Sequence, residues 1–251
     1  MRNATRWLVT LCACASGLSE AQAGEVSVAV AANFAAPMRQ IVAAFEQDTG
    51  HKASLALGST GRFYAQIKSG APYSVLLAAD DTTPTRLENE GFAVTRTRFT
   101  YAIGKLVLWS KQAGLVDDKG EVLRTNKFDR LALADPRLAP YGAAAIETLK
   151  RLGLQETLKP KFVQGENIAQ AYQFVATGNA ALGFISLSQV YAEGRLTQGS
   201  VWRVPESFYP PIRQDAILLR EARNSEAAKS LLQYLRSDKA RAIIRSYGYE
   251  F

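Results

Sequence analysis

The sequence predicts an α/β fold of two lobes, in which each lobe is a mostly parallel sheet flanked by helices and two crossover segments join the lobes. Short apolar runs of strand character alternate with stretches of helical period, and Gly, Pro, Asn, Ser or Asp marks each change. This alternating series occurs twice along the chain. A long β-prone segment at 99–109 separates the two series, and another at 212–219 follows the second. Such a chain builds two lobes and passes between them twice.

The first series contains three strand-to-helix units. They are a strand at 26–32 with a helix at 35–47, a strand at 53–57 with a short helix after the turn at 58–61, and a strand at 74–79 with a helix at 84–90. In the first helix, Met38, Ile41 and Phe45 recur at spacings of three and four, so they share one face that packs on a core. The third strand is largely apolar, which is typical of a parallel sheet covered on both sides.

The second series adds the elements of another lobe. They are a strand at 131–134, a turn at 135–142, a helix at 143–152, a strand at 161–163, a helix at 168–177 and a strand at 181–185, before closing helices at 225–236 and 238–247. The β-prone segments are long enough to carry the chain into the second lobe and back, which makes the first lobe discontinuous. The predicted boundaries are 24–103 for the N-terminal part of lobe I, 104–211 for lobe II and 212–251 for the C-terminal part of lobe I.

The first 23 residues have the pattern of an export signal. Arg2 and Arg6 precede a short apolar stretch, and the segment ends in Ala21-Gln22-Ala23, with small residues at the positions that a signal peptidase reads. We therefore expect a signal peptide at 1–23, cleavage after Ala23 and an exported protein, and the resemblance described below implies that it is periplasmic. An alternative is a lipoprotein anchored at Cys14, although the preceding Leu11-Cys12-Ala13 fits a lipoprotein signal poorly.

Composition excludes several classes of protein. Removing the signal takes away both cysteines, two arginines and one glutamate, so the net charge falls from +7 to +6 and no thiol remains for disulfides or thiolate metal sites. Lys and Arg are dispersed among acidic residues, without the basic stripe that nucleic acid requires, so we expect no nucleic-acid partner. After the signal, no apolar run approaches the roughly 20 residues of a membrane-spanning helix, so we expect no membrane insertion.

The search for catalytic residues argues against an enzyme. His51 is the only histidine, and a triad or a metal site would need partners for it that the sequence does not supply. The adjacent acids Asp80-Asp81 and Asp117-Asp118 lie on loops, where they more often cap helices than exchange protons. An exported hydrolase and a scaffold or sensor without a transport role remain the alternatives from other classes. The first predicts substrate turnover, and the second predicts no response to a small ligand.

Loops that lead from a strand into a helix recur in both lobes and suit an anion. The first turn of a helix leaves N–H groups without intrahelical acceptors and carries partial positive charge, so several such turns at one cleft can hold a dianion without Lys or Arg. Asn33, Ser59 and Thr60 add polar side chains at two of these loops. Each alone is by default a helix N-cap, so the convergence of several loops carries the hypothesis.

Several short motifs, in this order, resemble the periplasmic molybdate-binding proteins, the receptors of ABC importers. The motifs are Ala31-Ala32-Asn33-Phe34, Gly58-Ser59-Thr60-Gly61 followed by Tyr64-Ala65-Gln66-Ile67, Gly70-Ala71-Pro72, Asp135-Pro136, Pro140-Tyr141-Gly142 and the segment 98–110. The similarity extends from about Glu25 to Tyr249. It implies the type II fold of periplasmic binding proteins, with a tetrahedral oxyanion held by hydrogen bonds in a cleft between two hinged lobes.

The resemblance also implies a set of ligand contacts. These are Asn33 through its backbone and side-chain amide, the hydroxyl of Thr60 as the best match with that of Ser59 as the alternative, the backbone N–H groups of Tyr141 and Ile168, and Ser186 at a position that some members fill with Tyr. Serine is shorter, which puts the last contact in doubt unless the Tyr141 phenol or a water replaces it. No side chain is expected to coordinate the metal, since molybdenum is bound as its oxyanion, and no cofactor is expected.

The donor set bears on which anion binds. A fully deprotonated oxyanion only accepts hydrogen bonds, whereas protonated phosphate also needs an acceptor. The implied contacts contain no carboxylate, which favours molybdate, tungstate or sulfate unless Glu166 or Asp80 lies in the cleft. The preference for molybdate and tungstate over sulfate comes from the resemblance, as do the partners: an ABC transporter permease and its ATPase subunit. We expect a monomer that closes on the anion about its two crossings and delivers it to the importer.

Overall fold

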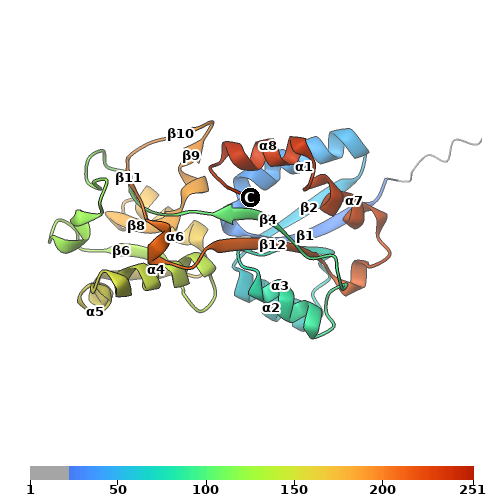
Figure 1. Cartoon of the computed structure of the whole chain (residues 1–251), viewed down its shortest axis with the longest axis horizontal. Helices are drawn as coiled ribbons and strands as arrows, with labels where there is room; N and C mark the ends of the chain where they lie inside the picture. The colour runs from blue at the N-terminus through green and yellow to red at the C-terminus, as the bar shows by residue number, and fades with distance from the viewer. Residues whose placement is uncertain (1–22) are drawn as a thin grey trace, which may run out of the picture.

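The computed structural model describes residues 23–251, which form two five-stranded sheets with helices on both faces. Figure 1 shows the two sheets in separate lobes that lie side by side along the long axis of the molecule. The predicted signal peptide, with Cys12 and Cys14, lies outside the described residues apart from its last residue, Ala23. Within the described part, no helix is both long and apolar enough to cross a bilayer.

The first sheet has the strand order β2-β1-β3-β12-β4. Its strands are β1 (Glu25–Ala31), β2 (Lys52–Gly58), β3 (Val75–Leu77), β4 (Phe99–Gly104) and β12 (Ile212–Leu218). Its helices are α1 (Ala35–Thr49), α2 (Thr60–Lys68), α3 (Thr82–Asn89), α7 (Glu226–Tyr234) and α8 (Asp238–Ser246), with the 3-10 helices η1 (Ala32–Phe34) and η6 (Arg220–Ala222). All strands except β12 run in one direction, because β12 is antiparallel to both of its neighbours.

The second sheet has the order β11-β5-β8-β6-β7. Its strands are β5 (Leu106–Ser110), β6 (Leu131–Ala134), β7 (Phe162–Gly165), β8 (Leu182–Ser186) and β11 (Ser200–Arg203), and a small separate ribbon joins β9 (Tyr191–Ala192) to β10 (Arg195–Leu196). Its helices are α4 (Pro140–Arg151), α5 (Gln155–Leu158), α6 (Ile168–Ala176), η2 (Glu121–Arg124), η3 (Lys159–Lys161), η4 (Leu187–Gln189) and η5 (Glu206–Phe208). Only β5 opposes the common strand direction. The predicted α/β fold of mostly parallel sheets is confirmed.

Both sheets are covered on two sides by apolar side chains. In the first lobe Met38, Ile41 and Phe45 are fully buried against β1 and β3, as the helical spacing predicts, while α7 and α8 extend the same core. On the opposite face, Phe63 of α2 and Leu87 of α3 pack beneath the sheet. Strands buried on both faces are apolar throughout, which explains why they are readable in the sequence.

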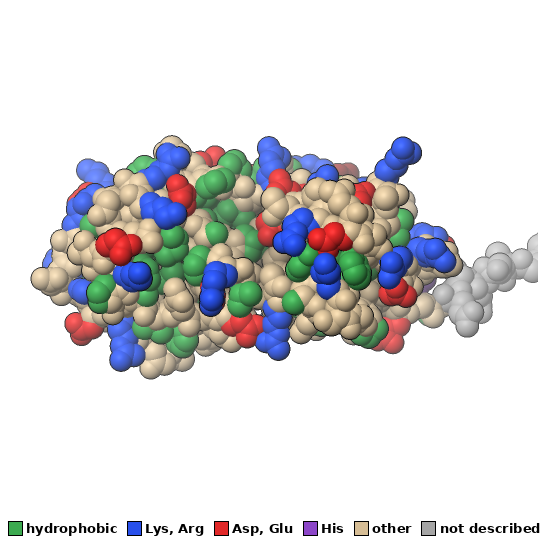
Figure 2. Space-filling view, turned by 90° about the horizontal axis from the view of Figure 1, so that it is seen from below, with side chains coloured by type: hydrophobic (Ala, Val, Ile, Leu, Met, Phe, Trp, Pro, Cys, Tyr) green, Lys and Arg blue, Asp and Glu red, His purple; other side chains and the backbone are tan. Residues whose placement is uncertain are grey.

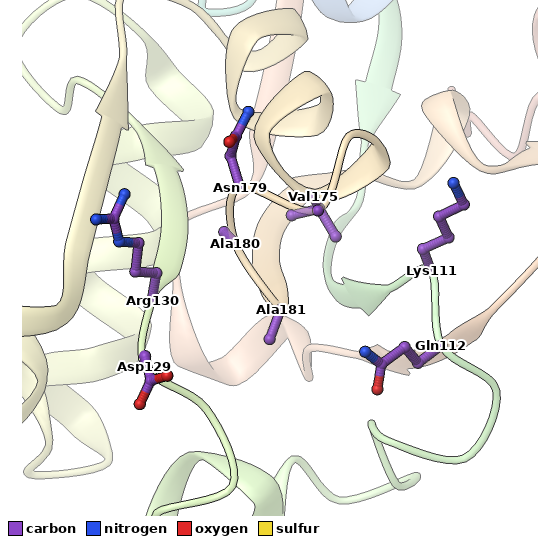
Figure 3. Close-up of a pocket in the computed structure, with 9 residues that line it drawn as sticks. Lys111, Gln112, Asp129, Arg130, Val175, Asn179, Ala180 and Ala181 are labelled. Carbon is purple, nitrogen blue, oxygen red and sulfur yellow. The ribbon is translucent and has the colours of Figure 1, made fainter.

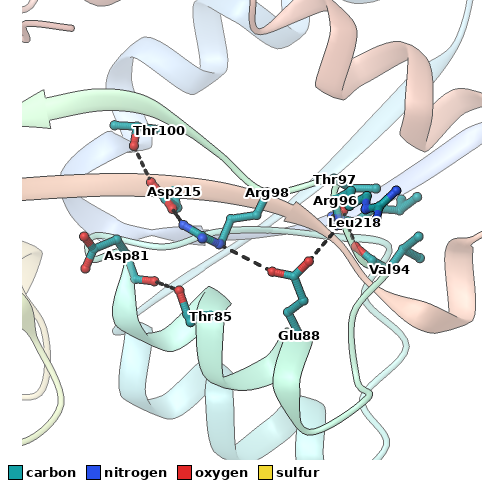
Figure 4. A network of polar contacts seen from close by, with 10 residues as sticks. All are labelled: Asp81, Thr85, Glu88, Val94, Arg96, Thr97, Arg98, Thr100, Asp215 and Leu218. Carbon is teal, nitrogen blue, oxygen red and sulfur yellow. Dashed lines mark hydrogen bonds and ion pairs between the residues drawn. The ribbon is translucent and has the colours of Figure 1, made fainter.

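The chain changes lobes between β4 and β5, where Lys105 alone separates the two strands. The β-prone run at 99–109 is therefore two strands in different sheets, and β12 returns the chain to the first sheet. Asp215 anchors this return strand, since its buried carboxylate accepts from Arg98 at 2.6 Å and from the Thr100 hydroxyl at 2.7 Å (Figure 4). The lobe boundaries at 24–103, 104–211 and 212–251 stay a prediction.

Some element boundaries differ from the prediction for local reasons. Helix α4 begins at Pro140, not at 143, because proline suits the first helical position, where its missing N–H costs nothing. The predicted turn at 135–142 is shorter as a result. The sequence pattern also missed β9, β10, β11 and α5, which have two to four residues each.

Gly104, the last residue of the first crossing strand, makes room for two side chains from elsewhere in the chain. A Cβ atom at this position would lie 2.0 Å from the Tyr141 hydroxyl and 2.6 Å from Gln214 Nε2. We predict that Gly104→Ala lowers the free energy of unfolding by about 1–3 kcal/mol, the usual cost of overpacking a core. Chemical denaturation measures this change. Because Tyr141→Phe removes the hydroxyl, Gly104→Ala should cost less in that background, and an equal cost in both backgrounds would contradict the explanation.

Candidate functional site

A small cavity of about 10 Å³ lies between the two lobes. It is lined by Ala31, Ala32, Asn33, Gly58, Ser59, Thr60, Ala79, Ala139, Pro140, Tyr141, Asn167 and Ile168. None of these described residues carries a charged side chain. The lining is instead backbone, small side chains and a few neutral polar groups, so the site can offer hydrogen bonds but no formal charge.

The fold brings these residues together because they all follow or approach the carboxyl ends of parallel strands. Ala31 pairs with Gly58 at the ends of β1 and β2, so the loops that enter η1 and α2 lie side by side. In the second lobe Ala134 pairs with Gly165 at the ends of β6 and β7, which places the beginnings of α4 and α6 together. Ligands of open α/β sheets bind at this edge.

Ser59 supplies a buried hydroxyl that lacks a partner. The residue is 3% exposed, lines the cavity, and its Oγ is the one buried side-chain polar atom without a hydrogen bond in the described part of the chain. Ser59 occupies the N-cap position of α2, yet its side chain does not cap the helix. A buried hydroxyl without a partner costs about 1–3 kcal/mol, so an acceptor in the cavity would recover this energy.

Thr60 has a different role from its neighbour. Its Oγ1 accepts a hydrogen bond from the backbone N–H of Ala79 at 2.9 Å, which ties the second loop to the end of β3. Thr60 still lines the cavity, and its hydroxyl hydrogen can still be donated. Of the two alternatives that the sequence left open, this arrangement favours Ser59 as the main hydroxyl donor.

Asn33 lines the cavity, but its side chain points into the protein. The amide nitrogen donates to Gln214 Oε1 at 2.7 Å and to the Tyr249 hydroxyl at 2.9 Å, so both amide hydrogens are in use. These bonds contradict the expectation that the side chain donates to a ligand. The backbone carbonyl of Asn33 accepts from Ser188 and Tyr249, and only the backbone N–H is left to serve the cavity.

Tyr141 and Ile168 occupy the first turns of α4 and α6. The Asn167 side chain caps α6 by accepting from Ala169 and Gln170, so the N–H of Ile168 is left without an acceptor among residues 23–251. The N–H of Tyr141 likewise has none there, since the first turn of a helix lacks intrahelical acceptors. Both predicted backbone donors therefore line the cavity with a hydrogen to give.

The Tyr141 phenol and Ser186 lie behind the cavity. The phenol oxygen accepts from Gln214 Nε2 at 3.3 Å, and complete burial raises the pKa of this hydroxyl well above its usual value. Ser186 does not line the cavity, and its Oγ lies 2.7 Å from Ser188 Oγ. Ser186 therefore does not reach the cavity in this structure, and its role as a ligand contact stays a prediction, while the phenol oxygen has Gln214 as a partner within the protein.

A buried polar network supports both halves of the site. Its side chains are Asn33, Tyr101, Tyr141, Ser186, Ser188, Gln214 and Tyr249. Gln214 of the return strand is the centre, because its carbonyl oxygen accepts from Asn33 and Tyr101 while its nitrogen donates to Tyr141. The network therefore connects a loop of the first lobe to a loop of the second, through the strand that joins them.

Glu166 and Asp80, the two carboxylates that could have supplied an acceptor, do not line the cavity. Glu166 accepts from Arg62 across the lobes, at 2.7 Å and 2.9 Å. Asp80 accepts from the N–H and hydroxyl of Thr83, and burial raises the pKa of its carboxyl. The cavity among the described residues therefore has donors but no carboxylate acceptor.

Other candidates from the sequence have structural roles. His51 is half-buried, stacks on Phe45 and accepts the N–H of Gly24 through Nδ1 at 3.0 Å. Asp117 accepts the N–H groups of Lys119, Glu121 and Val122, as a loop-capping acid does. In residues 23–251 no group of three His, Cys, Asp or Glu side chains could hold a metal ion.

A larger pocket of about 480 Å³ lies in the second lobe, away from the cavity (Figure 3). Lys111, Asp129, Arg130 and Asn179 surround it, and all four are exposed to solvent. It contains no buried polar group that lacks a partner, and it has none of the residues that the sequence singles out. The small interlobe cavity is the candidate site because it contains the unpartnered Ser59 hydroxyl.

Comparisons with known proteins define the class. A family model described as "Bacterial extracellular solute-binding protein" matches residues 26–250, and the chain belongs to this family. Its relatives are solute-binding proteins, so the chain is a binding protein and not an enzyme, as the sequence predicts.

Figure 2 shows one face of this protein, where Lys and Arg are scattered among Asp and Glu as the charge pattern indicates.

Two relatives share one name. The molybdate-binding protein ModA of Azotobacter vinelandii is 58% identical over 229 residues, which cover 91% of each chain. The protein of the same name from Rhodobacter capsulatus is 52% identical and covers 91% of this chain and 89% of its own. A solved structure, the Azotobacter vinelandii periplasmic molybdate-binding protein, superimposes with a TM-score of 0.87 at 40% identity, covering 90% of this chain and 99% of that one.

The unpartnered Ser59 hydroxyl should lower the stability of the ligand-free protein while it contributes to ligand binding. Ser59→Ala removes a buried polar group, so we expect it to raise the free energy of unfolding of the ligand-free protein by about 1 kcal/mol. Thr60→Val should lower it by a similar amount, since the Ala79 N–H loses its acceptor. Urea denaturation measures both changes. A loss of stability in Ser59→Ala would show that this hydroxyl has a partner within the protein.

Proposed function

We propose that this protein is the periplasmic receptor of an ABC importer, and that it binds molybdate in the interlobe cavity. The observation that carries the proposal is the unpartnered Ser59 hydroxyl in a cavity whose lining has donors from both lobes and no charged side chain. The similarity to two molybdate-binding proteins supports the choice of ligand. Tungstate, which has the same charge and shape, is proposed as a second ligand.

The proposed contacts are hydrogen bonds from uncharged groups. Ser59 donates through its hydroxyl, Asn33, Tyr141 and Ile168 donate through their backbone N–H groups, and Thr60 is an additional hydroxyl donor. The first turns of α2, α4 and α6 carry the partial positive charge of helix N-termini, which stabilises an anion without Lys or Arg. In a cavity that excludes water, these bonds are stronger than in solvent.

The same donor set selects against protonated anions. Hydrogen phosphate must donate its own O–H, and a cavity without a carboxylate offers that proton only hydroxyl, amide or backbone carbonyl oxygens. Arg62 and Thr83 engage the nearby carboxylates, which therefore do not supply the missing acceptor. Sulfate is fully deprotonated and remains the second candidate within this class. The similarity to two molybdate-binding proteins is what favours molybdate over sulfate.

Transport then follows from closure of the cleft. The open protein would capture the anion on one lobe, and the second lobe would close on it about the crossings at Lys105 and at the start of β12. Because the proposed donors come from both lobes, the bound anion stabilises the closed form, which marks the occupied receptor for the permease. We propose that the receptor is a monomer, that its signal is cleaved after Ala23, and that a separate ATPase subunit supplies the energy.

Titration with four anions tests the proposal. We expect purified mature protein to bind molybdate and tungstate tightly, sulfate more weakly and phosphate not at all, because only phosphate brings a proton into the site. Isothermal titration calorimetry measures each affinity. Equal binding of all four anions would contradict the selectivity, and binding of none would overturn the proposed function.

Substitution at the proposed donor tests the site itself. A hydrogen bond to a charged group contributes about 1.5–3 kcal/mol, so Ser59→Ala should weaken molybdate binding by about 10- to 150-fold. Ser69→Ala is the matched control, since Ser69 is exposed at the other end of α2 and should bind as the parent does. Calorimetry on both variants gives the comparison. Unchanged affinity in Ser59→Ala would place the anion elsewhere.

A further inference from the structure

We infer that Arg62 and Glu166 determine how long an oxyanion stays bound, by joining the two lobes at the edge of the cleft without touching the anion. This inference rests on the proposed function. The two residues are called the latch pair below. Neither lines the cavity, and neither is a proposed ligand contact.

The latch pair connects the loops that carry the proposed donors. Arg62 lies in the first turn of α2, three residues after Ser59, and Glu166 lies two residues before Ile168. Arg62 Nη1 is 2.7 Å from one oxygen of the Glu166 carboxylate and 2.9 Å from the other. One partner belongs to the first lobe and the other to the second, so the pair can form only when the lobes meet.

Neighbouring contacts show that α2 and the second lobe are in direct contact here. The N–H of Gly61 donates to the backbone oxygen of Leu138 at 2.9 Å, and a Cβ on Gly61 would lie 3.1 Å from that same oxygen. Gly61 therefore allows the close approach that brings Arg62 within reach of Glu166. Opening the cleft would separate all of these groups together.

Within residues 23–251, the Arg62 guanidinium and the Glu166 carboxylate form hydrogen bonds only with each other. The N–H of Glu166 donates to Gln170 Oε1 at 2.7 Å, so the loop keeps its own support when the carboxylate is changed. The side chains of Arg62 and Glu166 are 56% and 32% exposed. Exposed ion pairs are weak, and loss of this one should speed release by about two- to fivefold without unfolding the protein.

The alternative is that the charges of Arg62 and Glu166 act on the anion only through their electric fields. This alternative predicts opposite effects on binding for the two residues. The positive charge of Arg62 attracts a dianion and the negative charge of Glu166 repels it, whether or not the pair holds the lobes together. In that case neutralising Arg62 would weaken binding while neutralising Glu166 would strengthen it. A latch predicts that either neutralisation speeds release, and that exchanging the two charges restores slow release.

The test is the rate of molybdate release, measured by stopped-flow intrinsic fluorescence after rapid dilution. We expect Arg62→Gln and Glu166→Gln each to release molybdate about two to five times faster, with little change in the association rate. The double variant Arg62→Glu with Glu166→Arg should return close to the parent rate. High salt should accelerate release from the parent but not from the single variants, because it screens an exposed pair.

Lys239→Gln is the matched control. Lys239 of α8 lies 2.9 Å and 2.7 Å from the two carboxylate oxygens of Asp48 in α1, so it forms an equally exposed pair, but within the first lobe. Its release rate should equal that of the parent. Slower release from Glu166→Gln, or parental rates in both single variants, would overturn the latch while leaving molybdate binding intact. A parent that does not bind molybdate would instead overturn the proposed function, and the latch with it.

Discussion

The site depends on one constraint: hydrogen-bond donors must be buried in a shared cavity although the protein supplies no acceptor for them. Burying a donor without a partner is costly, and proteins rarely do so. In this protein the donors without a partner are the Ser59 hydroxyl and the first-turn N–H groups of Tyr141 and Ile168. An anion that only accepts hydrogen bonds is the partner that this arrangement fits. Since the described lining has no charged side chain, the proposed source of affinity is the geometry of the donors and not net charge.

The rest of the fold keeps those donors in position. Parallel strands end together, which brings two loops of each lobe to one edge, and the small residues Ala32, Gly58 and Ala79 let the backbone approach the cavity. Behind the cavity, Gln214 connects Asn33 to Tyr141, and Gly104 leaves space for that connection. The hinge and the binding loops therefore form one hydrogen-bonded unit.

Much of the fold could be predicted because its physical signals are local. The apolar stripe of α1 and the apolar strands β3 and β8 are periodic or continuous, and the structure buries them as expected. The start of α4 was missed because Pro140 looks like a turn residue until its place at the first helical position is known. Short elements such as β9 and β10 have too few residues to show a periodic pattern of apolar side chains.

The candidate site was predictable as a set of loops but not in its side-chain detail. The sequence identifies Asn33 as a donor, yet two partners distant in sequence, Gln214 and Tyr249, take up its amide. The choice between Ser59 and Thr60 likewise depends on the Ala79 N–H, which only the packing of β3 brings near. Ser186 resembles a ligand position by alignment of motifs, but it faces Ser188. Contacts of this kind have no signature within one loop.

The most direct test of the central claim is a crystal structure with molybdate, phased at the molybdenum absorption edge. The account predicts one anomalous peak in the interlobe cavity, with oxyanion oxygens within hydrogen-bond distance of Ser59 Oγ and of the backbone nitrogens of Asn33, Tyr141 and Ile168. A peak outside this cavity, or an anion held there by a Lys or Arg side chain, would contradict it.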